Sequence, residues 1–529
     1  MIRLSRLVVL LGICWGLSVA PLLAQNIDDV LRYSERNPAT GAHDMGWLGA
    51  NTTAGAGSYT ALFGNPAGLG WTPESTVSGV LLGGLTNNET RFQSPSDGLS
   101  GPFNDTQSGY RIGNAAVTYR VPTAQGSLVF GGAINRTRSF DRTFVASGMN
   151  AQSSITDTFL PTASGFSVDG DGDLNFDRNI SRIAFLAGAI EFFDADFQEG
   201  RYPFDQAVAP GPVFGTNIEQ RDDLIETGGL YEASFGGAVE VAPRVMLGGS
   251  FHVSFGSYTF DRIFEEVDVN NTHTNDLYDV LLDDGSLLRG FDALTVESAV
   301  NAELTGIGAR FGASAMPNDF VKIGLTVATP TYYTVTETFG TRIETFFNEG
   351  GSLSAGNTDG SEFEYDIRTP WQVSAGTEVL LGPLTVAGDV ELVDWSTMNI
   401  SADGTSFSRV NRQIRDLDMT VNAKGGVAYD INALTLRGGV GYQPNPRSNS
   451  PQSDRTFFSG GFTYQFGPQL AFDLGWMQER FDDQFVSYDD IDDWNLDPDD
   501  PAARDAITAP RITESIVRNS FSVGVRYRF

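Results

Sequence analysis

The chain ends in Ser520-Phe521-Ser522-Val523-Gly524-Val525-Arg526-Tyr527-Arg528-Phe529, a stretch in which polar and apolar residues alternate strictly. A period of two is typical of a β-strand that has one apolar face and one polar face. The same alternation recurs upstream over residues 231–241, 245–255, 371–381 and 419–429. The apolar faces of such strands meet either a dry core, as in a soluble β-sandwich, or the lipid around a membrane barrel.

The connections between these strands favour the membrane barrel. Tight turns, such as Ala242-Pro243-Arg244 and Leu381-Gly382-Pro383, alternate with long acidic connections. Outer-membrane barrels have short periplasmic turns, long extracellular loops and an even number of strands, and counting strands between the turns gives about fourteen. We therefore predict an all-β fold, a 14-stranded antiparallel transmembrane β-barrel over residues 75–529, with long extracellular loops at 141–227, 261–292 and 488–512.

The first residues of the chain have the pattern of an export signal. Arg3 and Arg6 precede an apolar stretch, and Leu22-Leu23-Ala24 offers a cleavage site before Gln25. We predict a signal peptide over residues 1–24, Sec export and insertion into the bacterial outer membrane. The single cysteine, Cys14, falls inside this peptide, so the mature chain would have no disulfide and no cysteine nucleophile.

The composition excludes several classes of protein. The chain has 529 residues, with 66 Asp and Glu against 34 Lys and Arg, for a net charge of -32. Such an acidic chain would be repelled by phosphate backbones, which excludes a nucleic-acid partner. A hydrophobic content of 41% is too high for a disordered polymer. The strong acidic bias also suggests a saline habitat, a hypothesis that thermal stability in low and molar NaCl would test.

The first mature residues, 25–74, do not read as strands. Residues 28–36 predict one short helix, and residues 41–70 are rich in Gly, Ala, Thr and Ser. This tract ends in Asn65-Pro66-Ala67-Gly68-Leu69-Gly70, in which Pro66 has a fixed φ and the glycines permit close backbone approach. We predict a compact irregular segment that fills the barrel.

These N-terminal stretches also resemble a known family. Asp29-Val30-Leu31-Arg32-Tyr33-Ser34, the Gly-rich tract and the Asn65–Gly70 stretch are similar to the plug of FadL-type transporters of hydrophobic compounds. Later segments, Arg368-Thr369-Pro370-Trp371 and residues 436–442, are similar too. The resemblance implies a barrel whose lumen is closed by the plug, with Asn65, Pro66, Ala67 and Gly68 as the plug motif.

The same resemblance implies passive uptake of fatty-acid-like or aromatic molecules, with no cofactor. The ligand would enter a pocket inside the barrel and leave sideways into the membrane, through an opening made by a kink in the third strand. Apolar residues along this route would attract such a ligand, because burial is worth about 25 cal/mol per Å². We expect a monomer whose partners are the hydrophobic ligand, outer-membrane lipid, lipopolysaccharide and the barrel assembly machinery.

A ligand-capture surface is predicted in the long 141–227 connection, where residues 183–193 are too apolar for a solvated loop. A connection of this length usually has a function or is disordered. The alternative is that these residues pack a loop subdomain over the barrel mouth. The candidate capture residues are Phe185, Leu186, Ile190, Phe192 and Phe193.

Two further sets of residues are candidates for the transport route. Gly131 and Gly132, in the predicted third strand, could interrupt the ladder at the wall opening, or could simply ease curvature. A ligand carboxylate would favour a cation on an inward face, although such cations usually pair with inward acids such as Asp389 and Glu391. The inward cations are Lys322, Lys424, Arg437 and Arg526.

The predicted sixth strand changes phase along its length. The apolar residues lie at even-numbered positions over residues 300–304 and at odd-numbered positions over residues 307–311, so they lie on opposite faces of a regular strand. A β-bulge near Thr305-Gly306 would produce such a change.

Metal and catalytic sites find little support. Asp169, Asp171 and Asp173 begin like a calcium loop, yet Leu174 occupies the position that needs glycine, so at most weak calcium binding is expected. Only three histidines are present, and no Ser–His–acid grouping is visible. We predict that the chain is not an enzyme. A lipase assay would identify the alternative, an outer-membrane hydrolase.

Two other functions fit a membrane barrel. One is a general diffusion porin, and the other is a plugged barrel that serves a protein partner in secretion. Deleting residues 25–70 would separate them, because a plugged carrier would begin to leak ions and a porin would not. A partner-binding barrel would co-purify with another protein.

Overall fold

The computed structural model describes residues 26–39, 41–96, 98–161, 166–168, 174–176, 178–192, 207–208, 218–282, 284–357, 361–448, 451–489 and 508–529. The predicted signal peptide, residues 1–24, lies outside this part of the chain. Among the described residues, no helix is long and apolar enough to cross a membrane.

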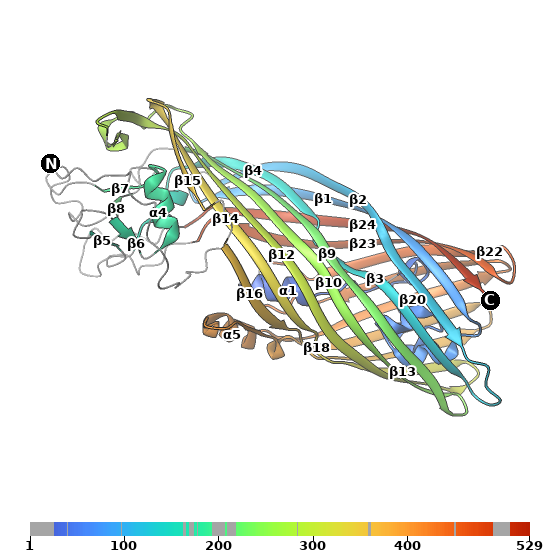
Figure 1. Ribbon diagram of the computed structural model, residues 1–529. Helices are drawn as coiled ribbons and strands as arrows, with labels where there is room; N and C mark the ends of the chain where they lie inside the picture. Colours follow the sequence, from blue (N-terminus) through green and yellow to red (C-terminus); the bar gives the residue numbers. More distant parts are fainter. Residues whose placement is uncertain are drawn as a thin grey trace.

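Antiparallel strands form a closed barrel (Figure 1). In the described residues the chain crosses the wall fourteen times, and β1 (Thr76–Ser94) pairs with β24 (Arg511–Arg528) to close it, as the sequence predicts. The other wall strands are β2 (Gly98–Arg120), β3 (Leu128–Ser139) continued by β4 (Arg142–Asn150), β9 (Ile218–Ala242), β10 (Val245–Val267), β12 (Leu287–Asn318), β13 (Val321–Ala328) continued by β14 (Tyr332–Glu349), β16 (Ser361–Arg368) continued by β17 (Gln372–Leu381), β18 (Leu384–Asp394), β20 (Met419–Ile431), β21 (Leu434–Gln443), β22 (Arg455–Gln465) and β23 (Leu470–Val486).

The apolar faces of the strands point away from the barrel. Phe521 and Val525 are 49% and 50% exposed, whereas Ser522 between them is fully buried against the interior. In a β-sandwich these apolar residues would be the buried ones. The exposed apolar residues therefore form the lipid-facing band of an outer-membrane barrel.

The wall is taller on one side, where β9, β10 and β12 have 25, 23 and 32 residues. About ten residues suffice for a tilted strand to cross the bilayer, so these strands continue beyond it. The predicted loops at 141–227 and 261–292 are therefore wrong in part, because β4 and the ends of β9, β10 and β12 occupy them. In the third predicted loop, 488–512, β24 begins at Arg511, and residues 490–507 lie outside the described part.

A cap of short elements covers the inner face of the tall side. It contains η3 (Ile155–Phe159) and α4 (Asn179–Leu186), which pack against Phe264, Leu294 and Ile343 of the extended strands. This apolar contact gives the extensions a core of their own. The remaining short elements are β5 (Phe166–Val168), β6 (Leu174–Phe176), β7 (Glu191–Phe192), β8 (Ala207–Val208), η5 (Asp276–Tyr278), β11 (Val280–Leu281), β15 (Ser352–Gly356), η6 (Trp395–Thr397), β19 (Asn399–Ser401) and α5 (Ser408–Arg415).

The predicted bulge at Thr305-Gly306 is absent, since β12 pairs without a register shift there with both β10 and β14. The apolar residues change face because the surroundings change. Ala302 and Leu304 point inward into an apolar cluster in the lumen. Ile307 and Phe311 point outward to the lipid, and they are 61% and 59% exposed.

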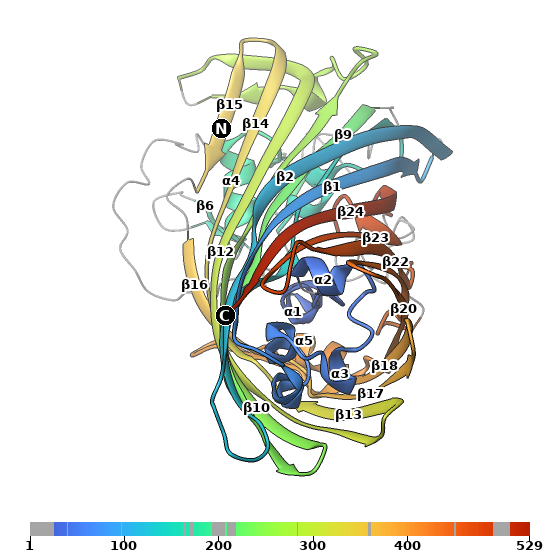
Figure 2. The same ribbon diagram turned by 90° about the vertical axis from the view of Figure 1, so that its right-hand side faces the viewer.

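The N-terminal segment lies inside the barrel (Figure 2). Its elements are α1 (Ile27–Ser34), α2 (Gly41–Met45), α3 (Thr52–Gly55), η1 (Tyr59–Phe63) and η2 (Pro66–Trp71). Asn26 caps α1, because its side chain accepts from the backbone of Asp29 while the Asp29 carboxylate accepts from Asn26. This segment, residues 26–71, is the plug, as predicted.

Candidate functional site

The predicted plug motif joins the plug to the wall. The buried Asn65 side chain donates to the carbonyl oxygens of Thr53 at 2.7 Å and Ala313 at 2.9 Å, and its oxygen accepts from the Ala67 amide at 3.0 Å. One side chain thus connects α3, wall strand β12 and the start of η2. Pro66 occupies the first turn of η2, where its missing amide proton is not needed. Gly68 lies too close to the Ala56 backbone to carry a side chain.

Glycines of the inner wall make room for the plug backbone. A Cβ atom at Gly324 would overlap the Thr53 carbonyl, and one at Gly312 would overlap the Asn65 side chain. We call these positions the wall notches. They occur on most strands around the plug, at Gly248, Gly312, Gly324, Gly376, Gly426, Gly439, Gly461 and Gly475.

Beyond α1, on the extracellular side of the plug, the lumen holds a cavity of about 560 Å³, which we call the chamber. This volume is within the usual range for a small-molecule site. Apolar and aromatic side chains contribute much of its lining, with α1 at one side and the β3–β4 segment at another. These apolar residues are Leu31, Phe140, Tyr258, Phe260, Val300, Phe481, Phe485 and Ile516.

Seven arginines also line the chamber, and three of them share the carboxylates of Glu35 and Glu479. Glu35 accepts from Arg138 at 2.6 Å and pairs with Arg455 at 2.8 Å, and Glu479 pairs with Arg455 at 2.8 Å and Arg518 at 3.4 Å. The guanidinium groups of Arg455 and Arg518 lie 4.5 and 5.1 Å from the centre of the Phe481 ring. Such cation–π contacts hold the arginines against the apolar lining.

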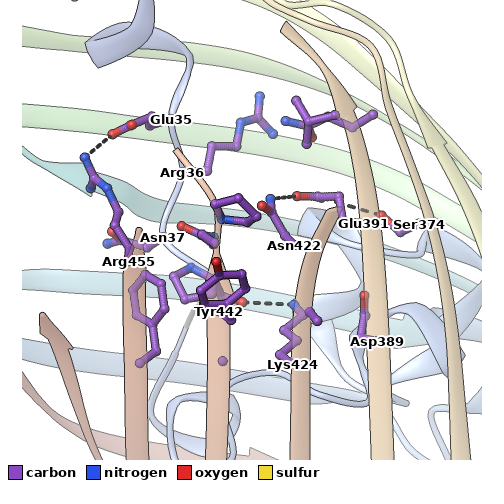
Figure 3. A pocket seen from close by; sticks show the side chains of 18 of the residues that line it. Glu35, Arg36, Asn37, Ser374, Asp389, Glu391, Asn422, Lys424, Tyr442 and Arg455 are labelled. Atoms are coloured by element: carbon purple, nitrogen blue, oxygen red, sulfur yellow. Dashed lines mark hydrogen bonds and ion pairs between the residues drawn. The ribbon is translucent and has the colours of Figure 1, made fainter. Parts of the chain in front are cut away.

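A smaller pocket of about 140 Å³ lies between the plug and β17, β18 and β20 (Figure 3). Glu391 accepts from Asn422 at 2.9 Å and from Ser374 at 3.5 Å at one side, while the Glu35–Arg455 pair lies at the other. Its lining also includes apolar side chains, among them Phe63, Val393 and Phe457. Its volume is, however, only about a quarter of that of the chamber. The chamber is therefore the better site for a hydrophobic molecule.

The wall is broken beside the chamber. β2 pairs with β3 only from Arg120 to Asn114, whose partner is Asn135, and within the described residues the rest of β2 has no strand partner on that edge. Beyond this point β4 pairs with β9 alone. Asn88 and Thr90 of β1 each donate to carbonyl oxygens of β4 at 3.2 Å, so β4 has moved inward from the wall.

Gly131 and Gly132 do not lie at this break. Both pair with β2 and with β9, so the ladder is intact at these positions. A Cβ atom at Gly131 would meet Leu62 and Leu69 of the plug at 3.4 and 3.5 Å. The register shift of β3 occurs instead between Arg136 and Arg138.

The predicted inward cations all contact the plug or the inner wall. Lys322 pairs with Glu378 at 2.8 Å, and Arg526 pairs with Asp473 at 3.4 Å. Lys424 donates to the Pro38 carbonyl at 3.1 Å, and Arg437 contacts His43 at 2.9 Å. The chamber lining contains none of these four cations. The chamber arginines were missed because their strands extend beyond the lipid-facing band, where the alternation that marks inward faces is weaker.

The predicted capture residues have different surroundings. Phe185 and Ile190 are buried in the core of the cap, at 8% and 0% exposure, which is the packing role considered as the alternative. Leu186 ends α4 and is partly buried, and Phe192 belongs to β7. Phe193 lies outside the described residues, as do Asp169, Asp171 and Asp173. In the described part, no group of three or more potential metal-ligating side chains occurs.

One buried carboxyl group joins the cap to the wall, and we expect it to make the stability of the cap depend on pH. Glu266, beyond the lipid-facing band of β10, accepts from the Ile155 amide at 2.9 Å and from Gln220 at 2.7 Å. Burial raises the pKa of the Glu266 carboxyl to about 7. The folded cap therefore holds a proton that the unfolded cap releases above pH 4.5, so cap stability falls by about 3 kcal/mol as the pH rises from 4.5 to 7.

Hydrogen exchange of the η3 amides at several pH values, corrected for intrinsic exchange rates, would measure this loss. The Glu266→Gln variant should remove the pH dependence and keep the cap folded. An unchanged pH dependence in that variant would assign the effect to another group.

The comparisons with known proteins agree with this architecture. The model of a family described as outer membrane protein transport protein (OMPP1/FadL/TodX) matches residues 231–529, more than half of the chain. The chain belongs to the OMPP1/FadL/TodX family. The predicted family is thus confirmed, and this family member is an outer-membrane transport protein. Members of the family are transport channels rather than enzymes.

Individual relatives of this OMPP1/FadL/TodX family member are distant. The crystal structure of a Pseudomonas aeruginosa FadL homologue matches with a TM-score of 0.53 at 12% identity, covering 94% of this chain and 100% of that one, which shows the fold. The P. putida toluene transporter TodX matches with a TM-score of 0.48 at 14% identity, covering 93% and 99% of the two chains. The 47 kDa outer membrane protein of Pasteurella multocida (strain Pm70) is 26% identical over 129 residues, 22% of this chain and 30% of that relative's length.

Proposed function

We propose that this protein takes up hydrophobic small molecules, either fatty-acid-like or aromatic, by passive diffusion through the chamber and out through the break in the wall. One observation carries the proposal. Arg138 and Ser139 at the end of β3, and Phe140 directly after it, line the chamber. They lie where β3 no longer pairs with β2, although it still pairs with β9. The chamber and the break are therefore adjacent.

The route suits a molecule that prefers lipid to water. Lipopolysaccharide slows its direct entry into the membrane, and a wide aqueous pore would offer it no affinity. The apolar lining of the chamber supplies that affinity, since each buried Å² of apolar surface contributes about 25 cal/mol. Movement down a concentration gradient then needs no energy source.

The plug is connected to the segment that would have to move. The Asn37 amide donates to the Thr137 carbonyl at 3.0 Å, and Glu35 pairs with Arg138. On the other side of the break, Arg111 of β2 pairs with Asp141 at 2.9 Å. These contacts close the passage, so release of the plug segment 35–37 would loosen the β3 segment and widen the break.

Blocking the exit tests the proposal. Replacing Ser139 with tryptophan would place a large ring where β3 has separated from β2. Uptake of radiolabelled oleate and toluene should then fall to roughly a tenth, a change of about 1.4 kcal/mol in the barrier. The assay uses a strain that lacks its own carrier and expresses the full chain.

The matched control is Val486→Trp, which adds the same ring to the chamber lining on β23, a strand that pairs with neither β2 nor β3. It should transport more than the Ser139→Trp variant. Equal uptake by Ser139→Trp and the unmodified protein would reject the lateral exit. Failure of the unmodified protein to transport every apolar solute would reject the uptake function itself.

A further inference from the structure

Helix α5 carries an unusual charge for this chain. It contains Arg409, Arg412 and Arg415 and no acidic residue, although the chain as a whole has a net charge of -32. All three side chains are exposed. In the described part of the chain, no ion pair joins any of them to a carboxylate.

The helix is fixed, so the arginines have a defined direction. Ile414 is fully buried in the apolar cluster of the lumen, and Val410 packs against the same cluster. The Asn411 side chain donates to the Ile400 carbonyl at 2.8 Å and accepts from the Ile400 amide at 3.0 Å. Residues three apart are neighbours on a helix surface. The arginines therefore form one exposed face, which we call the α5 arginine face.

This face lies at the edge of the lipid-facing band. Met419, at the start of β20, pairs with Asp394 of β18, and the backbone of Asp394 bonds to that of Trp371. The side chains of Met419 and Trp371 are 57% and 47% exposed. Exposed tryptophan is typical of the membrane–water interface. Arg415 is only a short turn before Met419. Figure 1 shows α5 at the low rim of the barrel, near β16 and β18 and away from the tall wall.

We infer that the α5 arginine face binds the phosphate groups of phosphorylated lipid in the outer leaflet, the class to which lipopolysaccharide belongs. Guanidinium groups form paired, charge-assisted hydrogen bonds to phosphate oxygens. The band edge places these cations at the depth of the lipid headgroups. The aspartates of the same loop, Asp403, Asp416 and Asp418, are exposed, and within the described residues none of them forms an ion pair with the arginines of this face.

A lipid-binding measurement on the purified full chain tests this inference. Native mass spectrometry would compare phosphorylated lipid A, lipid A without its phosphates, and inorganic phosphate as a competitor. The Arg409→Gln/Arg412→Gln/Arg415→Gln variant should bind phosphorylated lipid A roughly a hundredfold more weakly, because each of the three arginines near an anionic surface contributes about a factor of five. Its binding of dephosphorylated lipid A should not change.

The control removes the same charge elsewhere. Arg91, Arg221 and Arg342 are partly exposed arginines of the wall strands, each near a carboxylate, and replacing all three with glutamine should leave lipid A binding unchanged. Heat-dependent mobility in gels verifies that both variants remain folded barrels. Equal losses in the two variants, retained binding in the α5 variant, or full displacement of lipid A by an equal concentration of inorganic phosphate would each overturn the inference.

Discussion

Replacing Gly324 with valine will unseat the plug and make the barrel leak ions. The new Cβ atom would overlap the Thr53 carbonyl, which belongs to the plug backbone and cannot rotate away as a side chain can. Overpacking of this kind costs about 1–3 kcal/mol even when side chains can adjust, and more when backbone must move. Planar-bilayer conductance of the purified protein would measure the effect.

The control is Gly388→Val, the same change at a glycine of β18 that faces lipid. Only the Lys424 carbonyl oxygen lies near its Cβ position, at an ordinary 3.9 Å. This variant should conduct no more than the unmodified barrel. If the Gly324→Val variant also conducted no more than the unmodified barrel, the position of the plug would not depend on the wall notches.

Replacing Glu35 with glutamine will free the plug segment from the β3 strand. The substitution removes the carboxylate that pairs with both Arg138 and Arg455, whose side chains are mostly buried. Breaking a buried ion pair from one side costs about 3 kcal/mol, because the remaining charge is left unpaired. Exchange of the Asn37 amide, which donates to β3, should accelerate about a hundredfold.

Asp28→Asn serves as the comparison, since Asp28 is 55% exposed and pairs with Arg447 near the same helix. An exposed pair contributes at most about 1 kcal/mol, so Asn37 should exchange almost as slowly as in the unmodified protein. Equal exchange in the two variants would show that the Glu35 pairs do not hold the plug segment.

The barrel wall could be predicted because its strands contact a uniform solvent on each face. Residues such as Phe521 and Val525 face lipid over the whole membrane, so a period of two persists in the sequence. The plug could be predicted because Asn65 and Pro66 form a short local motif. The bonds of Asn65 to α3 and to wall strand β12 could not, since Ala313 lies 248 residues away in the sequence.

The errors arise where the surroundings change along one element. β12 faces an apolar lumen at Leu304 and lipid at Ile307, which looks like a bulge when only the hydrophobic pattern is read. Gly131 and Gly132 were candidates for the wall opening, with eased curvature as the alternative, but both pair with β2 and β9, and Gly131 gives room to Leu62 and Leu69. The chamber arginines depend on contacts between residues such as Glu35 and Arg455, which no local pattern reveals.

The position of the wall break determines how deep in the membrane a passenger would emerge. On β2, Tyr110 and Ile112 lie at the break and are 92% and 65% exposed, whereas Asp105 and Gln107, nearer the extracellular end, bond to polar groups of β4 and β9. A molecule leaving here would enter only the outer half of the bilayer. It would still have to flip across the membrane unaided, a step that is fast for a neutral hydrocarbon and slow for an ionised acid. The overall flux of the two ligand classes would then differ even if the protein released both at the same rate.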